Sequence, residues 1–299
     1  MKQLVKKSPD ITIRLHIASW QLAYAQKWLG NLSVSLVPVE KAYIPTPEGR
    51  LLWTRSALAN TDFDFLVSDN LLEVTEFDQT LAIVGSFLWG ERNTKYWNDP
   101  LWITTHKLKM PIFGLDFLSM PAVRELSGFQ PVGLIGKMEE QKIPGNEILF
   151  SFGRSDASNT LCDQVRDVVC PDGRLLKGII FDDVRNSEPV GDYSAEFFSR
   201  FSAAVIRPGI GTVSDCLRYG IPMVIFHEPD TDEMEWNTKV LVENGLATVA
   251  HTADEALTKA YEWNDQNQRA EFHKKRHILR WDGENEIALG IQDLLEEKL

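Results

Sequence analysis

Cysteine is scarce in this sequence, with three among 299 residues, at positions 162, 170 and 216. This spacing matches no common metal-binding motif, and three thiols cannot all pair as disulfides. Such sparse cysteine is typical of a protein kept in a reducing compartment. No apolar run approaches the roughly twenty residues that a membrane span requires, and the N-terminus has no apolar signal-peptide core. We therefore expect a cytoplasmic protein without a metal site.

Positive charge is also in short supply. The chain has 31 Lys and Arg residues against 43 Asp and Glu residues, which gives a formal net charge of −12. General nucleic-acid binding requires a basic surface, so the charge balance argues against that class of protein. A local basic pocket for a diphosphate is still compatible with it. The hydrophobic content of 43% is typical of a folded globular chain.

The most informative stretch begins with a short apolar run at residues 203–206, which predicts a buried parallel strand. Pro208 and Gly209 end that strand. Gly209 and Gly211 allow the backbone to approach another group closely, and Thr212 is a suitable N-cap for the next helix. A glycine-rich turn that leads into a helix N-terminus is an anion site, because free N–H groups and the helix dipole point at one place.

Charged residues that could face the same anion lie beside this turn and after another predicted strand. Asp215 is one turn into the predicted helix, and Arg207 directly precedes the turn. Gly153 and Arg154 follow another predicted strand, and Arg154 could bind a phosphate bidentately. Both arginines have an alternative role: Arg207 as an ion-pair partner at the strand end, and Arg154 as a surface residue.

Residues 203–247 resemble the donor-binding signature of glycosyltransferase-B enzymes, above all that of the UDP-sugar transferases and of the N-acetylglucosaminyltransferase that makes lipid II. The resemblance implies that the glycine-rich turn and Thr212 hold the donor diphosphate. It implies that Asp215, where the family usually has Glu, binds the ribose. Glu235 and Asn237 lie in the polar cluster that meets the sugar. The expected donor-binding residues are Gly153, Arg154, Arg207, Gly209, Gly211, Thr212, Asp215, Glu235 and Asn237.

Strands alternate with helices along the chain, which predicts an α/β fold with largely parallel sheets. With the resemblance, this becomes a glycosyltransferase-B-like pair of Rossmann-like domains facing a cleft. A polar segment at residues 136–146 suggests a boundary between an acceptor-side domain, 1–138, and a donor-binding domain, 139–299. No strand and glycine-rich turn precede the strand-like run at 11–17, so the first domain is expected to lack its first strand. The resemblance also implies that the final helix returns to the first domain.

Two residues are candidates for catalysis. Asp69 ends a predicted strand and is the best carboxylate for a general base, although Asp at such a position is more often a turn residue. His227 follows a predicted strand and could act as an acid near neutral pH, with an exposed loop histidine as the alternative. Asp182 and Asp183 could hold a metal, but the resemblance implies no requirement for one.

The expected function is therefore an inverting transfer of a sugar from a nucleotide-diphosphate donor, with UDP as the expected nucleotide, and no cofactor. The acceptor is left open among small molecule, glycan and lipid, and a lipid would bring the protein to a membrane surface. The oligomeric state is also open. Two alternatives remain. One is a non-catalytic nucleotide-sugar-binding or partner subunit, suggested by the missing first strand. The other is an epimerase or hydrolase of the same fold.

Overall fold

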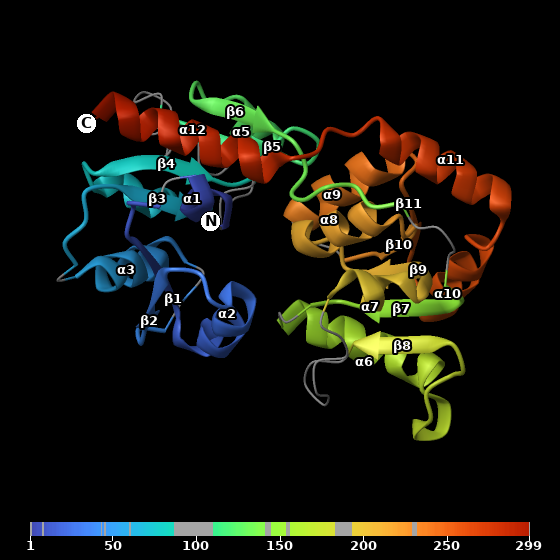
Figure 1. The fold of residues 1–299 in the computed structure, drawn as a ribbon. Helices are drawn as coiled ribbons and strands as arrows, with labels where there is room; N and C mark the ends of the chain where they lie inside the picture. Colours follow the sequence, from blue (N-terminus) through green and yellow to red (C-terminus); the bar gives the residue numbers. More distant parts are fainter. Residues whose placement is uncertain are drawn as a thin grey trace. The chain divides into compact units, whose positions relative to one another are not determined.

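The computed structural model describes residues 2–7, 9–42, 44, 46–59, 61–86, 110–140, 145–153, 156–182, 193–228 and 232–298. The chain divides into two compact units, Met1–Leu134 with Asp282–Leu299, and Ile135–Trp281. Both units consist of parallel strands and helices (Figure 1), so the predicted α/β fold is confirmed. Within the described residues, no helix is both long enough and apolar enough to span a membrane.

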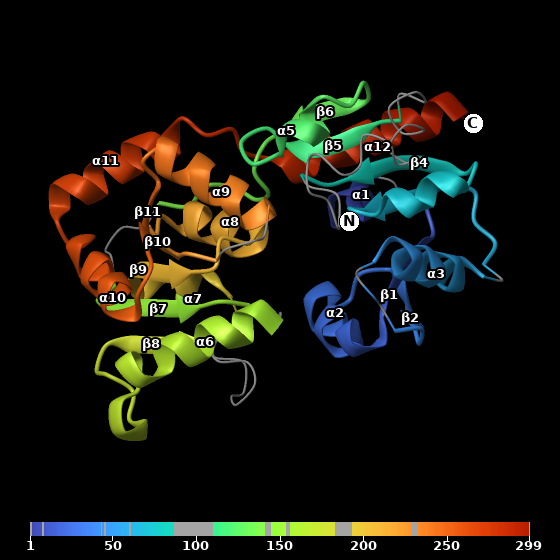
Figure 2. The ribbon, with the colours of Figure 1, turned by 180° about the vertical axis from the view of Figure 1, so that it is seen from behind.

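The second unit contains a five-stranded parallel sheet in the order β11-β10-β9-β7-β8. Its central strand, β9, is buried at every position, as expected for a strand covered on both faces. Helix α10 packs on β9, β10 and β11, while α8 and α9 lie side by side in both views (Figures 1 and 2). The strands are β7 (Glu147–Ser151), β8 (Ile179–Asp182), β9 (Phe201–Ile206), β10 (Met223–Phe226) and β11 (Ala247–Ala250). The helices are α6 (Asp156–Val169), α7 (Ala195–Ser199), α8 (Ile210–Tyr219), α9 (Asp232–Glu243), α10 (Ala253–Glu262) and α11 (Gln266–His277).

The first unit contains a two-stranded sheet, β1-β2, and a four-stranded sheet, β3-β4-β5-β6, both parallel. Among the described residues, the first strand is β1, and no strand joins the two sheets. The strands are β1 (Ile13–Ala18), β2 (Val34–Val39), β3 (Leu66–Asp69), β4 (Thr80–Val84), β5 (Ile112–Leu115) and β6 (Phe129–Val132). The helices are α1 (Lys2–Lys7), α2 (Leu22–Leu29), α3 (Pro47–Leu58), α5 (Pro121–Arg124) and α12 (Gly283–Lys298).

The final helix, α12, packs in the first unit, against α1, β4 and β6. Ala288 and Ile291 on this helix are buried, and the N–H of Gly133 donates to the Glu286 carboxylate at 2.7 Å. The compact units therefore meet in the sequence at Leu134 and Ile135, and residues 282–299 join the first unit. The sequence had indicated a boundary after residue 138 with a second domain of residues 139–299. The return of the final helix to the first domain, which the resemblance implied, is present.

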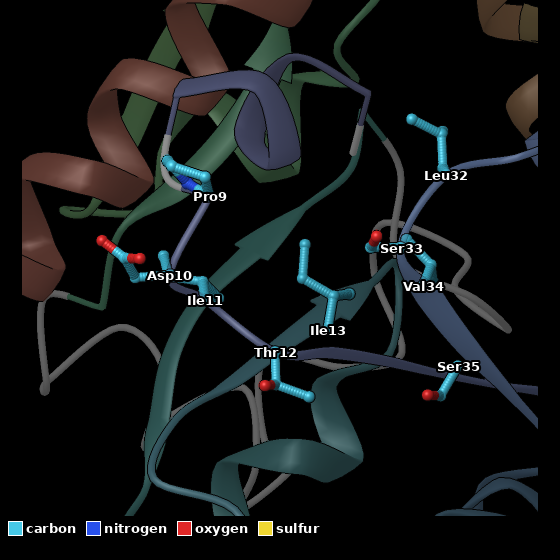
Figure 3. A pocket seen from close by; sticks show the side chains of 9 residues that line it. All are labelled: Pro9, Asp10, Ile11, Thr12, Ile13, Leu32, Ser33, Val34 and Ser35. Carbon is cyan, nitrogen blue, oxygen red and sulfur yellow. The ribbon is translucent and has the colours of Figure 1, made fainter.

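A shallow cavity of about 410 Å³ opens at the amino ends of β1 and β2 (Figure 3). Its wall mixes hydroxyl and aliphatic side chains on two adjacent strands. Ligands of open parallel sheets bind beyond the carboxyl ends of the strands, so this cavity is at the opposite edge from a usual binding site. The lining residues are Pro9, Asp10, Ile11, Thr12, Ile13, Leu32, Ser33, Val34 and Ser35.

Candidate functional site

The strand order of the second unit identifies a topological switch point. From β7 the chain continues to β8 on one side, and it later returns to β9 on the other side of β7. Ligands of such sheets bind in the crevice beyond the carboxyl ends of the two strands at the switch. Gly153, with φ of +81°, follows β7, and Arg207 follows β9. The Arg207 N–H donates to the Ser151 carbonyl at 3.3 Å, which joins the two strand ends.

The glycine-rich turn leaves backbone donors open at the start of α8. Gly209 is the N-cap, and no side chain caps the helix. Among the described residues, the N–H groups of Ile210, Gly211 and Thr212 donate to no acceptor, whereas the N–H of Val213 donates to the Gly209 carbonyl at 3.0 Å. These groups and the helix dipole together favour an anion. Thr212 is the third helical residue, so the prediction that it is the N-cap was wrong: the N-cap is Gly209, three residues earlier.

Open space lies in front of the two glycines of the turn. A Cβ atom added at Gly209 or at Gly211 would meet no atom within 4 Å. The φ of Gly209 is −66°, which any residue can adopt. Neither the packing of the chain nor this backbone angle explains glycine here, and glycine leaves room for another group to approach the backbone closely.

Arg207 is paired with a carboxylate beside the turn. Its guanidinium Nε donates to Glu228, a residue that is only 8% exposed, and a second nitrogen lies 3.4 Å from the other Glu228 oxygen. The ion pair at the strand end, one of the two roles expected for Arg207, is therefore present. Contact between Arg207 and a phosphate stays a prediction.

Glu233, in the first turn of α9, was not predicted from the sequence. Burial raises the pKa of its carboxyl to about 7, and the nearby Glu228 adds to this shift while Arg207 opposes it. The predicted residue, Glu235, is exposed. Residues two apart on a helix point to nearly opposite sides, whereas residues four apart share a face. Glu233 is four residues before the buried Asn237, and that spacing was the signal available in the sequence.

Asp215 and Asn237 lie on two different helices near the turn. Asp215, on α8, is half-buried, and burial raises the pKa of its carboxyl to about 6 against the opposing charge of Arg218. Asn237, on α9, is fully buried, and its Nδ2 donates to the Pro208 carbonyl at 2.9 Å. The site therefore combines open amides, a buried amide side chain and two carboxyls that bind protons more tightly than usual.

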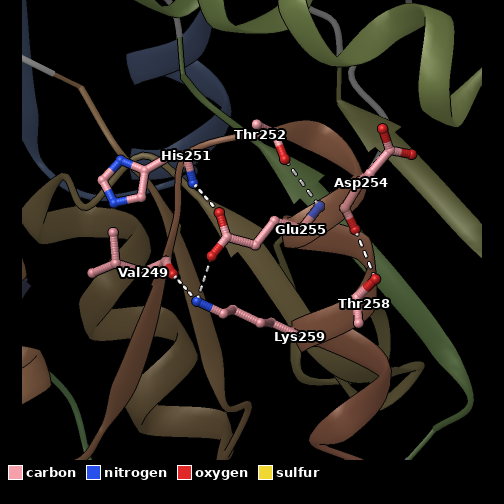
Figure 4. Close-up of polar contacts among 7 residues, drawn as sticks. All are labelled: Val249, His251, Thr252, Asp254, Glu255, Thr258 and Lys259. Carbon is pink, nitrogen blue, oxygen red and sulfur yellow. Dashed lines mark hydrogen bonds and ion pairs between the residues drawn. The ribbon is translucent and has the colours of Figure 1, made fainter.

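The two catalytic candidates lie in different units. Asp69 ends β3 in the first unit, is exposed, and accepts a hydrogen bond from Asn70 at 3.0 Å. His227 follows β10 in the second unit and is also exposed, with its ring centre 4.9 Å from that of His251. The backbone of His251 is held by Glu255, which also pairs with Lys259 (Figure 4). The catalytic roles of Asp69 and His227 stay predictions.

Two further sequence predictions concern Arg154 and the pair Asp182 and Asp183. Arg154 and Asp183 lie outside the described residues. Asp182 is buried and accepts hydrogen bonds from the hydroxyls of Ser151 at 3.1 Å and Tyr193 at 2.8 Å, so it supports the end of β8. In the part of the chain that the structure describes, no group of three or more His, Cys, Asp or Glu residues could hold a metal ion.

No protein-family model matches the sequence, and no curated protein sequence matches it significantly. Solved structures do resemble it. The glycotransferase of kitacinnamycin has a TM-score of 0.58 at 14% identity, with 99% of this chain and 94% of that chain covered. LpCGTa in complex with UDP has a TM-score of 0.61 at 11% identity, covering 98% and 94%. UGT2 of Phytolacca americana, complexed with UDP-2fluoro-glucose and pterostilbene, has a TM-score of 0.58 at 15% identity, covering 99% and 95%.

These likenesses extend over nearly the whole chain and establish its architecture. The chain has the fold of the glycosyltransferase-B enzymes, as the resemblance in residues 203–247 implied. The finer likeness to the lipid-II-forming transferase stays a prediction.

The raised pKa of Glu233 predicts that stability falls as pH rises. Because the folded-state pKa of about 7 exceeds the ordinary value of 4.5, the folded protein binds this proton more tightly than the unfolded chain. The contribution is complete below pH 4.5 and is lost as pH rises through 7. In urea unfolding, the free energy of unfolding should decrease between about pH 4.5 and 8. Glu233→Gln should remove about 1–3 kcal/mol of that decrease. Glu235→Gln, at an exposed position, should leave the pH dependence unchanged.

Proposed function

We propose that this protein is a glycosyltransferase that moves a sugar from a nucleoside-diphosphate donor, with UDP as the expected nucleotide, to a small-molecule acceptor. The observation that carries the proposal is the set of open N–H groups of Ile210, Gly211 and Thr212 beyond β9, with open space in front of the glycines. A diphosphate is the anionic group that these sugar donors share. The turn lies at the topological switch point, where open parallel sheets bind nucleotides.

The proposed roles follow the geometry of the second unit. The open amides and Thr212 bind the diphosphate, and the Asp215 carboxylate accepts a hydrogen bond from a ribose hydroxyl. Glu233, on the face of α9 that it shares with Asn237, is the candidate sugar contact of the structure, and the contact predicted for the exposed Glu235 stays a prediction. As the acceptor hydroxyl attacks the anomeric carbon with inversion, its proton passes to a base and the bond to the diphosphate oxygen breaks. Amides that stabilise the charge developing on that leaving group lower the barrier. Asp69 is the candidate base, and His227 is the candidate acid.

Structural neighbours support the chemical class of both substrates. LpCGTa was solved with UDP, and the Phytolacca americana enzyme was solved with UDP-2fluoro-glucose and pterostilbene. The spinosyn rhamnosyltransferase SpnG, with a TM-score of 0.51 at 12% identity, was solved with thymidine diphosphate. Nucleoside diphosphates and small aglycones are therefore the first ligands to test on this chain.

Thermal-shift titration with UDP, TDP and GDP tests the donor site, at about pH 7.5 where Asp215 is ionised. A ligand at about one hundred times its dissociation constant adds roughly 2.7 kcal/mol to the stability of the folded state. We expect UDP to stabilise the protein, and Asp215→Ala to weaken binding about tenfold or more. Asp167→Ala, which removes an exposed acid on α6, is the matched control and should bind as the wild type does.

This titration, together with analysis of the reaction products, separates the proposal from its alternatives. If no nucleoside diphosphate raises the melting temperature, the donor site is wrong. If UDP-sugar binds but is consumed without an acceptor, product analysis will identify a hydrolase or an epimerase, because a transferase leaves its donor nearly intact. If it binds and no acceptor is ever glycosylated, the non-catalytic binding subunit becomes the better description.

A further inference from the structure

One side chain from another helix reaches the backbone of the glycine-rich turn. Asn237 on α9 is fully buried, and its Nδ2 donates to the carbonyl of Pro208, which is 29 residues earlier in the sequence, at 2.9 Å. Pro208 immediately precedes the N-cap of α8 and is itself buried. Among the described residues, no other side chain from outside the turn forms a hydrogen bond with residues 208–212.

Two backbone hydrogen bonds also hold the turn, from the Gly209 N–H to the Arg207 carbonyl at 2.8 Å and from the Val213 N–H to the Gly209 carbonyl at 3.0 Å. Among the described residues, it has few other constraints on its conformation. Pro208 has no N–H to donate, and the two glycines allow more backbone angles than other residues do. No side chain caps α8, and nothing packs where a Cβ would lie at Gly209 or Gly211. A single hydrogen bond at the Pro208 carbonyl therefore has a large share in fixing the direction of the amides that follow.

We propose that Asn237 is a positioning residue that holds the anion-binding turn in its binding-competent conformation and does not itself touch the donor. This inference rests on the proposed function in one respect, because it takes the ligand of the turn to be a diphosphate. Misplacement of binding groups by about 1 Å can cost a hundredfold in rate. The bond also links the turn to α9, the helix that carries Glu233, so one helix supports the turn and supplies a neighbouring carboxyl.

Asn237→Asp tests the role with almost no change of shape. An ionised carboxylate in place of the amide has no proton to donate to the Pro208 carbonyl, so the bond is lost once pH exceeds the pKa of the new acid, which burial raises. Asn237→Leu has no donor at any pH and is measured beside it. The matched control is Asn244→Asp: the Nδ2 of Asn244 donates to the Val240 carbonyl at 2.7 Å, just beyond the same helix and away from the turn. If Asn237→Asp does not fold, Asn237→Leu removes the donor without adding charge.

Two measurements on the folded variants decide the matter. By calorimetry, Asn237→Asp should lose at least tenfold in affinity for UDP while the affinity for uridine changes less than twofold, because the diphosphate alone contacts the turn. By hydrogen exchange without ligand, the Val213 amide, bonded to the Gly209 carbonyl at 3.0 Å, should exchange at least tenfold faster. Asn244→Asp should match the wild type in both.

The outcomes distinguish this inference from the proposed function. A wild-type protein that binds no UDP refutes the donor site, and the Val213 exchange rate then decides the role of Asn237 alone. Equal losses of UDP and uridine affinity would mean a general structural role and would overturn the inference. So would an unchanged Val213 amide in Asn237→Asp, or equal effects of the Asn237 and Asn244 substitutions.

Discussion

Replacing Gly211 with valine is expected to abolish nucleoside-diphosphate binding and leave the folded protein as stable as the wild type. Gly211 is the second residue of α8, and a Cβ there would meet no atom within 4 Å. Valine is a better helix former than glycine by a few tenths of a kcal/mol, so folding should not suffer. A phosphate oxygen must approach the amides to about 3 Å, and the valine methyl groups would occupy that space.

We expect the affinity for UDP to fall at least a hundredfold in Gly211→Val, which is about 2.7 kcal/mol. Gly211→Ala, with a single added methyl group, should give a smaller loss. Calorimetry with UDP and urea unfolding of the same samples separate binding from stability. Unimpaired UDP binding by Gly211→Val would place the ligand away from the turn, and a large loss of stability would show that the chain itself needs glycine there.

Removing the carboxylate of Glu73 should cost the first unit much of its stability. The Arg50 guanidinium donates to Glu73 at 2.7 Å, and the two side chains are 4% and 2% exposed. Removing one partner of a buried ion pair leaves the other charge buried and uncompensated, which costs about 3–5 kcal/mol. Glu73→Ala should therefore lower the free energy of unfolding by about that amount and reduce the yield of folded protein.

A matched control lies three residues further along. Glu76 pairs with Arg55, also at 2.7 Å, and both ion pairs join residues 72–76 to α3. The side chains of Glu76 and Arg55 are 32% and 57% exposed. Glu76→Ala should cost at most about 1 kcal/mol, because water screens exposed pairs. The double variant Arg50→Met with Glu73→Leu should recover part of the loss by replacing charge with apolar contact. Equal costs for Glu73→Ala and Glu76→Ala in urea unfolding would contradict this account.

Local signals explain which elements the sequence predicted well. Residues 203–206 form part of β9, and Gly220 ends α8 with φ of +73°. The strand was predicted from its short apolar run, and a glycine at the end of a helix is a local signal of the same kind. Strand β11 (Ala247–Ala250) was not predicted, because its two β-branched residues, Thr248 and Val249, lie between alanines in a run of four residues. It is a strand because β10 offers a hydrogen-bonding edge and α9 and α10 cover it.

Side-chain partners in the site were harder to predict than the backbone. The turn itself was foreseen from two glycines and a proline. The partner of Arg207 was not, because Glu228 is 21 residues away and meets it only when β9 and β10 pair. Asn237 was expected to contact the sugar, and its bond to Pro208 depends on where α9 packs. Spacing suggests which residues share a helix face. Which surface that face packs against depends on how the helix lies on the folded sheet.

The return of the chain to the first unit at α12 makes the second unit a nested insertion. Residues 135–281 leave the first unit after Leu134 and rejoin it at Asp282, and the N–H of Gly283 donates to the Leu134 carbonyl at 3.0 Å. The exit and entry points are thus adjacent, as in folds that tolerate domain insertion. In such an arrangement the whole second unit can be exchanged between proteins of this fold through two neighbouring junctions. Under the proposed function, donor preference would then diversify by recombination of that unit, separately from acceptor preference.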